Sequence, residues 1–135
     1  MLALARLTQP GPFGMRTREL GNYIGIRREG KIVAMAGERL RVDAYTEISA
    51  VCTHPAHLGR GFAAKLMTEL AHRIRARGET PILHVRGSNT RAIALYERLG
   101  FETRVHLHCL VLRSEKEETE ATGAAHSRAQ NSRAK

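Results

Sequence analysis

Apolar and polar residues alternate along the first half of the chain in a pattern typical of strands. This alternation predicts strands over residues 22–27 and 31–40, joined by a short turn that ends at Gly30, where a positive φ is easily adopted. Residues 41–45 are polar and predict a connection. Residues 46–53 form the third expected strand, and their run ISAVC predicts burial on both faces.

The second half of the chain changes to a helical period. Phe62, Leu66, Leu70 and Ile74 recur every four residues, so we expect a helix over 62–77 that a glycine closes. The run PILHV predicts a short buried strand at 81–85. A second helix is expected through residue 99, with Asn89 as its N-cap, and a final strand over 104–112.

This order predicts one α/β (α+β) domain around a mixed sheet, over residues 1–113. The step from strand to helix to strand across residues 46–85 is a βαβ unit, which implies a parallel pair and a right-handed crossover. Residues 1–8 are expected to be the remnant of a helix, and 9–14 a loop. Residues 114–135 have no apolar periodicity and predict a disordered polar tail.

Charge narrows the choice of partner. The net charge of +9 belongs entirely to residues 1–113, because the tail is neutral, and it favours an anionic partner. Few aromatic residues are present, which disfavours a nucleic-acid stacking surface, and no apolar run approaches the length of a membrane span. Cys52 and Cys109 each lie in an apolar run and are expected to be buried, reduced thiols of a cytoplasmic protein; a disulfide or a catalytic thiol is the alternative.

The segment LGRGFA lies between the third strand and the first long helix. A helix N-terminus leaves free N–H groups and a partial positive charge, and Gly59 and Gly61 allow a ligand to approach the backbone closely. With Arg60 between them, the amides of this turn could hold a pyrophosphate. The alternative is that the glycines only permit a tight turn.

Two motifs resemble those of the GNAT superfamily of acetyl-CoA-dependent N-acetyltransferases. The family's Gln/Arg-x-x-Gly-x-Gly/Ala motif falls on residues 58–63, with matches at Gly61 and Ala63 and a departure at Leu58. Its Asn-x-x-Ala-x-x-hydrophobic-Tyr-x-x-x-Gly-Phe signature falls on residues 89–101. The resemblance implies a GNAT-like, mostly antiparallel central sheet flanked by helices, with acetyl-CoA bound at the βαβ unit. The residues it assigns to acetyl-CoA are Val51, Cys52, Thr53, Leu58, Gly59, Arg60, Gly61, Phe62, Ala63, Asn89, Ala92 and Tyr96.

The resemblance also implies catalytic roles. Tyr96 stands where the family has its general acid, although it could be an ordinary packing residue. Glu47 stands where related members have a general base; a raised pKa would suit that role, and the alternative is a solvent-facing glutamate. The amide of Val51 or its neighbour is the expected oxyanion donor. Arg86 and Arg91 could meet the cofactor's phosphates or be solvated surface residues.

The expected activity is therefore acetyl transfer from acetyl-CoA to a primary amine of a small molecule or protein, by direct attack in a ternary complex. A CoA-binding domain without catalysis is the alternative, and a nucleic-acid-binding module is disfavoured. His54 and His57 lack further ligands for a zinc site. The resemblance covers residues 20–112, so we expect either a front of the fold that is short or truncated, or a partner segment that completes the sheet edge, as a homodimer would.

Overall fold

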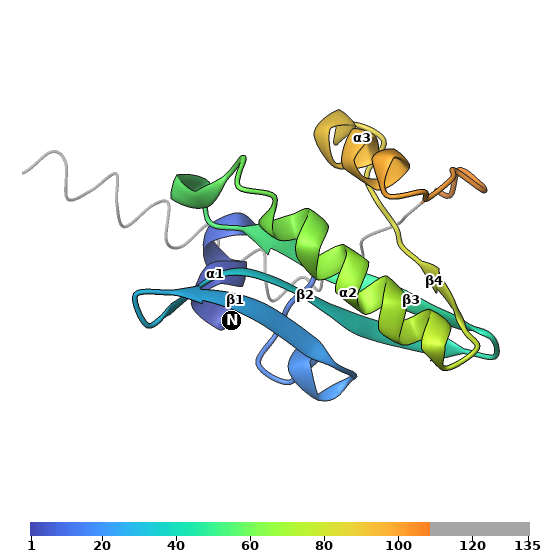
Figure 1. The fold of residues 1–135 in the computed structure, drawn as a ribbon, viewed down its shortest axis with the longest axis horizontal. Coiled ribbons are helices and arrows are strands. Elements are labelled where there is room, and N and C mark those ends of the chain that lie inside the picture. The colour runs from blue at the N-terminus through green and yellow to red at the C-terminus, as the bar shows by residue number, and fades with distance from the viewer. Residues whose placement is uncertain (109–135) are drawn as a thin grey trace, which may run out of the picture. The chain divides into compact units, whose positions relative to one another are not determined.

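A four-stranded sheet in the order β1-β2-β3-β4 organises the structure (Figure 1). The computed structural model describes residues 1–108; residues 1–102 form the unit that contains the sheet, and residues 103–108 belong to a second unit. β1–β2 and β2–β3 are antiparallel, whereas β3 and β4 are parallel, as the βαβ pattern predicts. The strands are β1 (Tyr23–Arg28), β2 (Lys31–Val42), β3 (Tyr45–Thr53) and β4 (Thr80–Ile82).

Two tight turns connect the antiparallel strands. Glu29 and Gly30 both have positive φ, which is the geometry of a two-residue hairpin turn. The second turn is shorter than expected: the strand pairing continues to Val42 and resumes at Tyr45, so the predicted polar connection over residues 41–45 is mostly strand. The prediction was wrong because it took polar residues as a sign of a loop. Both faces of the sheet are exposed at this end, where Val42 and Tyr45 pair, so strand residues can be polar here.

Helices lie on both faces of the sheet (Figure 1). α2 (Phe62–Ala76) covers one face, and Gly78, two residues after its end, has the φ of 77° that the predicted left-handed cap requires. α1 (Leu2–Thr8) contacts β2 and β3 and confirms the helix expected at residues 1–8. α3 (Thr90–Arg98) begins as predicted, since the Asn89 side chain accepts a hydrogen bond from the amide of Ala92.

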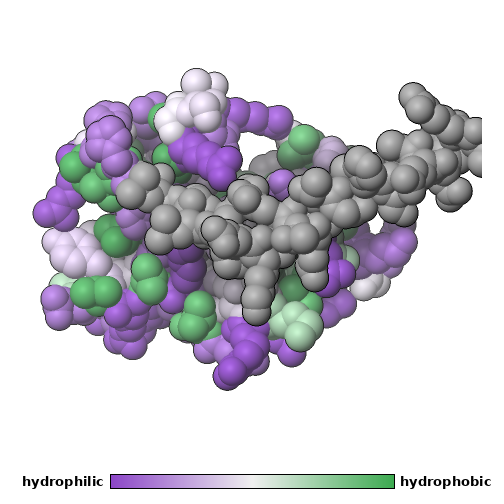
Figure 2. Space-filling view, turned by 180° about the vertical axis from the view of Figure 1, so that it is seen from behind, coloured by the Kyte–Doolittle hydropathy of each residue, from purple (hydrophilic) through white to green (hydrophobic). Residues whose placement is uncertain are grey.

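Each face of the sheet has its own core. Against α2 the buried residues are Ala34, Ala36, Ile48, Leu66, Met67, Leu70, Ala71 and Ile74. Against α1 they are Leu4, Ala5, Met35, Ala50 and Cys52. The strands β2 and β3 are therefore buried on both sides, which explains their nearly continuous apolar runs. Figure 2 views the side opposite to that in Figure 1 and shows hydrophobic side chains scattered among hydrophilic ones.

The strands toward the C-terminus differ from the prediction. β4 pairs with β3 only from Thr80 to Ile82, so the expected strand at 81–85 stops early, because the chain then diverges from β3. Residues 104–108 are exposed and in neither helix nor strand. The remainder of the expected strand 104–112, together with Cys109 and the expected tail, lies outside the described residues.

β3 carries an irregularity where it matters for the site. Cys52 pairs with Met35 and Ser49 with Gly37, so β3 has one more residue than β2 across this interval. Ala50, inside the interval, has a φ of 53°, a conformation that costs a residue with a Cβ some backbone strain. Such a bulge turns the backbone locally and changes which edge of the strand each amide faces.

Candidate functional site

The far half of β3 has an open backbone edge. β4 pairs with β3 only as far as Glu47, and the two strands then separate. The amide of His54 donates to the carbonyl of Val33 on β2. The backbone N–H and C=O groups of successive strand residues point to alternate edges of the strand. Those of Val51 and Thr53 therefore point away from β2, toward the gap left by β4. The hydroxyl oxygen of Thr53 is also buried with no hydrogen-bond partner among the described residues.

The turn before α2 presents its backbone to solvent. Gly59 and Gly61 have φ values of 76° and 70°, and among residues 1–108 no heavy atom beyond the adjacent residues lies within 4 Å of where a Cβ would stand on either. The carbonyl of Gly61 accepts the first hydrogen bond of the helix, from Lys65, so the amides of residues 62–64 have no partner within α2. Free amides, positive φ and open space together fit an anionic group such as a pyrophosphate.

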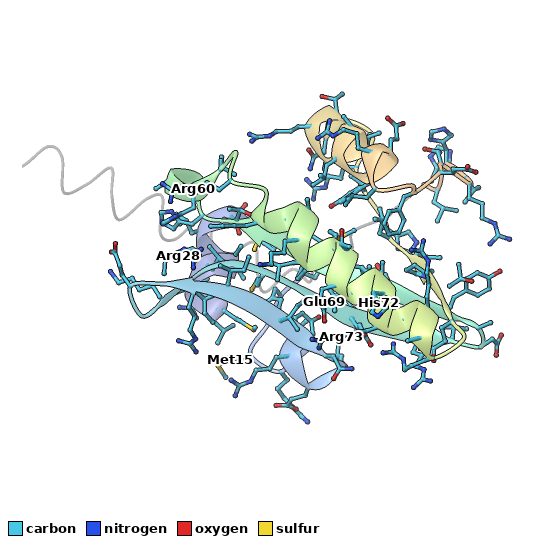
Figure 3. All side chains as sticks on the ribbon, viewed as in Figure 1. Met15, Arg28, Arg60, Glu69, His72 and Arg73 are labelled. Atoms are coloured by element: carbon cyan, nitrogen blue, oxygen red, sulfur yellow. The ribbon has the colours of Figure 1, made fainter. Side chains whose placement is uncertain are left out.

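Cationic and aromatic side chains surround this turn. Arg28, on the β1–β2 hairpin, lies with its guanidinium carbon 5.3 Å from the ring centre of Phe62, the first residue of α2. Figure 3 shows Arg28 and Arg60 at this same end of α2. The ring of His57 stacks on Phe62 at 6.4 Å, and its Nδ1 is buried without a hydrogen-bond partner in the described part of the chain.

Arg28 was not a predicted site residue. It lies 32 positions before Arg60 and outside both motifs, and only the hairpin pairing brings it to α2. The departure at Leu58, which is half exposed, removes a polar group from the motif. Arg28 and Arg60 supply positive charge at the same turn, so the residues present fit the phosphates of coenzyme A.

Glu47 lies on β3 where β4 begins to separate from it, and its carboxylate contacts two side chains. Its side chain is 2% exposed, and both carboxylate oxygens accept from Arg39: Oε2 from Nε at 2.9 Å and Oε1 from Nη2 at 2.7 Å. Nδ1 of His84 is 2.9 Å from the same Oε1. His84 follows β4 by two residues, and its side chain is 55% exposed.

This geometry corrects both expectations for Glu47. Burial acts to raise the pKa of its carboxyl, but the hydrogen bonds from Arg39 and His84 outweigh it, so the pKa is lowered rather than raised. A solvent-facing glutamate is equally excluded by its burial. Arg39 and His84 stand at unrelated positions in the sequence, so no spacing predicted that their side chains would contact Glu47.

Tyr96 lies on α3 and packs against the core on the α2 face. Its ring meets that of Phe101 edge to face at 6.3 Å. Burial raises the pKa of its phenol further above neutral pH, where a phenol is already protonated. The carboxamide oxygen of Asn89 and the amide of Ala92 are bonded to each other in the helix cap, which leaves the carboxamide nitrogen of Asn89 as its available donor.

One expected residue, Cys52, is not brought into this arrangement. The Cys52 side chain is buried in the cluster beneath α1, burial raises its pKa, and strand alternation directs its backbone toward β2. We therefore leave Cys52 out of the proposed site. Its burial as a free thiol does confirm that part of the prediction. Arg86 and Arg91 are exposed, which fits both alternatives, a solvated surface arginine and a contact with the cofactor's phosphates.

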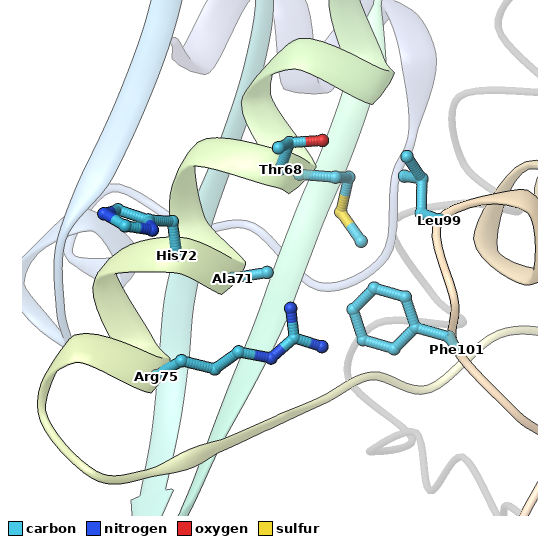
Figure 4. A pocket seen from close by; sticks show the side chains of 7 residues that line it. Thr68, Ala71, His72, Arg75, Leu99 and Phe101 are labelled. Carbon is cyan, nitrogen blue, oxygen red and sulfur yellow. The ribbon is translucent and has the colours of Figure 1, made fainter.

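Two cavities lie away from the open strand edge. One of about 200 Å³ lies between α2 and the segment that ends α3 (Figure 4), where the Arg75 side chain extends toward the ring of Phe101. The other, of about 510 Å³, lies beside α1 and includes Phe13, Arg18 and Arg27. Neither includes a residue of the two motifs other than Leu99 and Phe101, so the candidate site is defined by the strand edge and the helix turn.

No helix of residues 1–108 has the length and apolar character that crossing a bilayer requires.

Comparison with known proteins finds one matching family model and relatives that are named as acetyltransferases. The model of the FR47-like protein family matches residues 23–110. The N-alpha-acetyltransferase RimI of Mycobacterium tuberculosis is 37% identical over 100 residues, which cover 69% of this chain and 62% of that protein. The chain thus spans less than two thirds of this relative's length.

Solved structures agree with the sequence match. A GNAT-family protein from Novosphingobium aromaticivorans superposes with a TM-score of 0.74 and 47% identity, over 76% of this chain and 46% of that one. The ribosomal-protein-S18-alanine N-acetyltransferase of Escherichia coli gives a TM-score of 0.66 and 26% identity, over 76% of this chain and 70% of that one.

Proposed function

The chain belongs to the FR47-like family of the GNAT superfamily, and from this membership we propose that it is an N-acetyltransferase. In this proposal the acetyl group passes from acetyl-CoA to a primary amine by direct attack within a ternary complex. The observation that carries the proposal is the open backbone edge of β3, which leads directly to the free amides before α2.

The chain's own residues divide the binding of acetyl-CoA between them. The backbone edge at Val51 and Thr53 would hold the pantetheine arm by strand-like hydrogen bonds. The turn from Gly59 to Ala63 would hold the pyrophosphate, with Arg60 adding charge. Asn89 has a free carboxamide nitrogen that could donate to the cofactor while its oxygen caps α3.

Two donors would act at the reacting centre. When bound, acetyl-CoA supplies an activated acetyl group as a thioester. The amide of Val51, which follows the bulge and faces away from β2, would donate to the carbonyl oxygen, on which negative charge develops. The Tyr96 hydroxyl, which is protonated at neutral pH, would donate to the departing sulfur.

The α-amino group of a peptide or protein is the acceptor that we propose first. The similar RimI protein is named as an N-alpha-acetyltransferase. An α-amine has a pKa of about 8, whereas a lysine side chain has one of about 10.4, so the α-amine loses its proton far more easily near neutral pH. Small-molecule primary amines are the second class. We propose a cytoplasmic setting because Cys52 is a buried, reduced thiol.

The test combines binding with turnover. CoA affinity is measured by calorimetry, and thiol release from acetyl-CoA is followed over a panel of peptides with free α-amines, peptides with free lysines only, and small amines. We expect CoA binding and turnover that is fastest on α-amines. Binding without turnover on any amine would favour a CoA-binding domain that lacks catalysis, and absence of binding would exclude both functions.

A matched pair of variants locates the cofactor. Gly61→Ala and Gly78→Ala place the same methyl group at nearly the same positive φ, at opposite ends of α2, in open space. Both should lose similar stability, about 1 kcal/mol. Only Gly61→Ala should weaken CoA binding, because only that turn would hold the pyrophosphate; equal affinities would place the phosphates elsewhere.

A further inference from the structure

We propose that the cavity between α2 and the end of α3 is a second ligand site, which binds a small aromatic carboxylate and, when occupied, changes the rate of acetyl transfer. The binding part of this inference is independent of the proposed function, whereas the effect on rate rests on it. The cavity has a volume of about 200 Å³ (Figure 4). None of the described residues that line it is among those assigned to acetyl-CoA.

One face of α2 forms a polar wall of this cavity. Thr68, Ala71, His72 and Arg75 line it, and their spacing of three or four residues places them on the same side of the helix. Figure 4 shows the Arg75 guanidinium pointing toward the ring of Phe101, which comes from the other wall. The Thr68 hydroxyl and the His72 ring add hydrogen-bonding groups beside the guanidinium.

Arg75 differs from the two other arginines near the end of α2 in having no acidic partner. Nε of Arg73 lies 2.7 Å from Oε1 of Glu69, and Nη2 of Arg77 lies 3.0 Å from Oε2 of Glu38. Among residues 1–108 no carboxylate pairs with Arg75, and the residue is exposed. A guanidinium presents a planar fork of N–H donors that matches the two oxygens of a carboxylate. This arginine is therefore the group that would hold an anion at the cavity.

The apolar part of the lining selects the body of the ligand. Met67 is buried, and Leu99 and Phe101 are half-buried against the same core. A thioether and an aromatic ring both make favourable contacts with a second aromatic ring. Because an apolar cavity of about 150 Å³ can hold benzene, one of about 200 Å³ has room for a ring that carries a carboxylate. The single charge of a carboxylate also suits one guanidinium better than the nearly double charge of a phosphate monoester.

Phe101 joins the cavity to the proposed proton donor. Its amide donates to the carbonyl of Tyr96 at 3.0 Å, and the two rings meet edge to face at 6.3 Å. The amide of Leu99 donates to the same carbonyl, also at 3.0 Å. A ligand that packs on Leu99 and Phe101 therefore acts on the last turn of α3, which carries Tyr96. A displacement of about 1 Å at a reacting centre can change the rate by up to about 10²-fold, so occupation of the cavity should alter kcat.

The test titrates the full chain with benzoate and follows backbone amide signals by NMR, with and without saturating CoA. Benzamide, which has the ring without the charge, and acetate, which has the charge without the ring, are the control ligands. We expect benzoate to shift the signals of residues 99–101 with a Kd on the order of 1 mM or tighter. Both control ligands should bind about tenfold more weakly or worse, and CoA should leave benzoate binding unchanged.

Two arginine variants identify the group that holds the carboxylate. Arg75→Gln should weaken benzoate binding by about tenfold or more. Arg73→Gln makes the same change on the same helix, at a residue paired with Glu69 outside the cavity lining, and should leave benzoate affinity unchanged. Both variants should keep the thermal unfolding temperature of the wild type, because both residues are exposed.

The outcomes separate the site from the activity. Unshifted signals at residues 99–101, equal loss of affinity in the two variants, or displacement of benzoate by CoA would overturn the ligand site. A kcat that saturating benzoate changes by less than about twofold would overturn the effect on rate, given the sensitivity of a reacting centre to position. A protein that binds benzoate but acetylates no amine would instead refute the proposed function and leave the ligand site standing.

Discussion

Removing Arg39 tests how far the buried ion pair governs the stability of the site. In Arg39→Met the Glu47 carboxylate, which is 2% exposed, would keep only the hydrogen bond to His84. Breaking a fully buried pair by removing one partner costs about 3–5 kcal/mol. The Arg39 side chain is 27% exposed and the His84 contact remains, so we expect a smaller loss, about 2–3 kcal/mol.

The assay is urea unfolding followed by circular dichroism at neutral pH and near pH 4.5. In a domain of about 100 residues, each kcal/mol corresponds to roughly 4–8 °C in Tm, so the loss should also be visible in a thermal scan. The double variant Arg39→Met/Glu47→Leu should recover most of the stability, because it removes the unpaired charge together with its partner.

The pH dependence follows from the sign of the Glu47 shift. Burial alone raises the pKa, but Arg39 and His84 lower it below its ordinary value. The wild-type carboxylate therefore contributes stability that is present above the unfolded pKa of about 4.3 and is lost as pH falls through the folded pKa. Without Arg39, burial dominates and the shift reverses, so the loss in Arg39→Met should shrink on acidification. A loss below about 0.5 kcal/mol, a loss that does not vary with pH, or a double variant no better than the single one would refute this reasoning.

Three further predictions concern the cofactor and the sheet. Arg28→Gln should weaken CoA binding about tenfold, whereas Arg27→Gln, which removes the same charge from the opposite face of the sheet, should not weaken it. Calorimetry of both variants against CoA and pantetheine tests this. Equal losses of CoA affinity in the two variants would mean that only the net charge of the protein matters. Tyr96→Phe should lower kcat far more than CoA affinity, because it removes a proton donor and retains the packing; equal losses in steady-state and binding assays would indicate a packing role. Gly37→Ala should destabilise the fold by about 1–3 kcal/mol, because the added Cβ would stand 2.1 Å from a ring carbon of Tyr23; an unfolding midpoint equal to wild type would contradict the close approach.

The local periods of the sequence were enough to predict most elements. The alternation over 22–40 predicted the β1–β2 hairpin, and the four-residue period over 62–77 predicted α2 with its cap at Gly78. The prediction was wrong where pairing, and not composition, decides the end of a strand. β4 stops at Ile82 although PILHV continues to look like a buried strand, because β3 is no longer beside it.

The sequence by itself determined the chemistry that lies close together in the chain: the glycines before α2, the N-cap of α3 and the family to which they belong. Only the tertiary structure decided the contacts between distant positions. Arg39, Glu47 and His84 come from three strands or their ends, and Arg28 reaches α2 from a hairpin. The physical reason is that hydrogen bonding within a strand or helix depends on neighbours in sequence, whereas the burial and pKa of a charged group depend on which strands lie beside it.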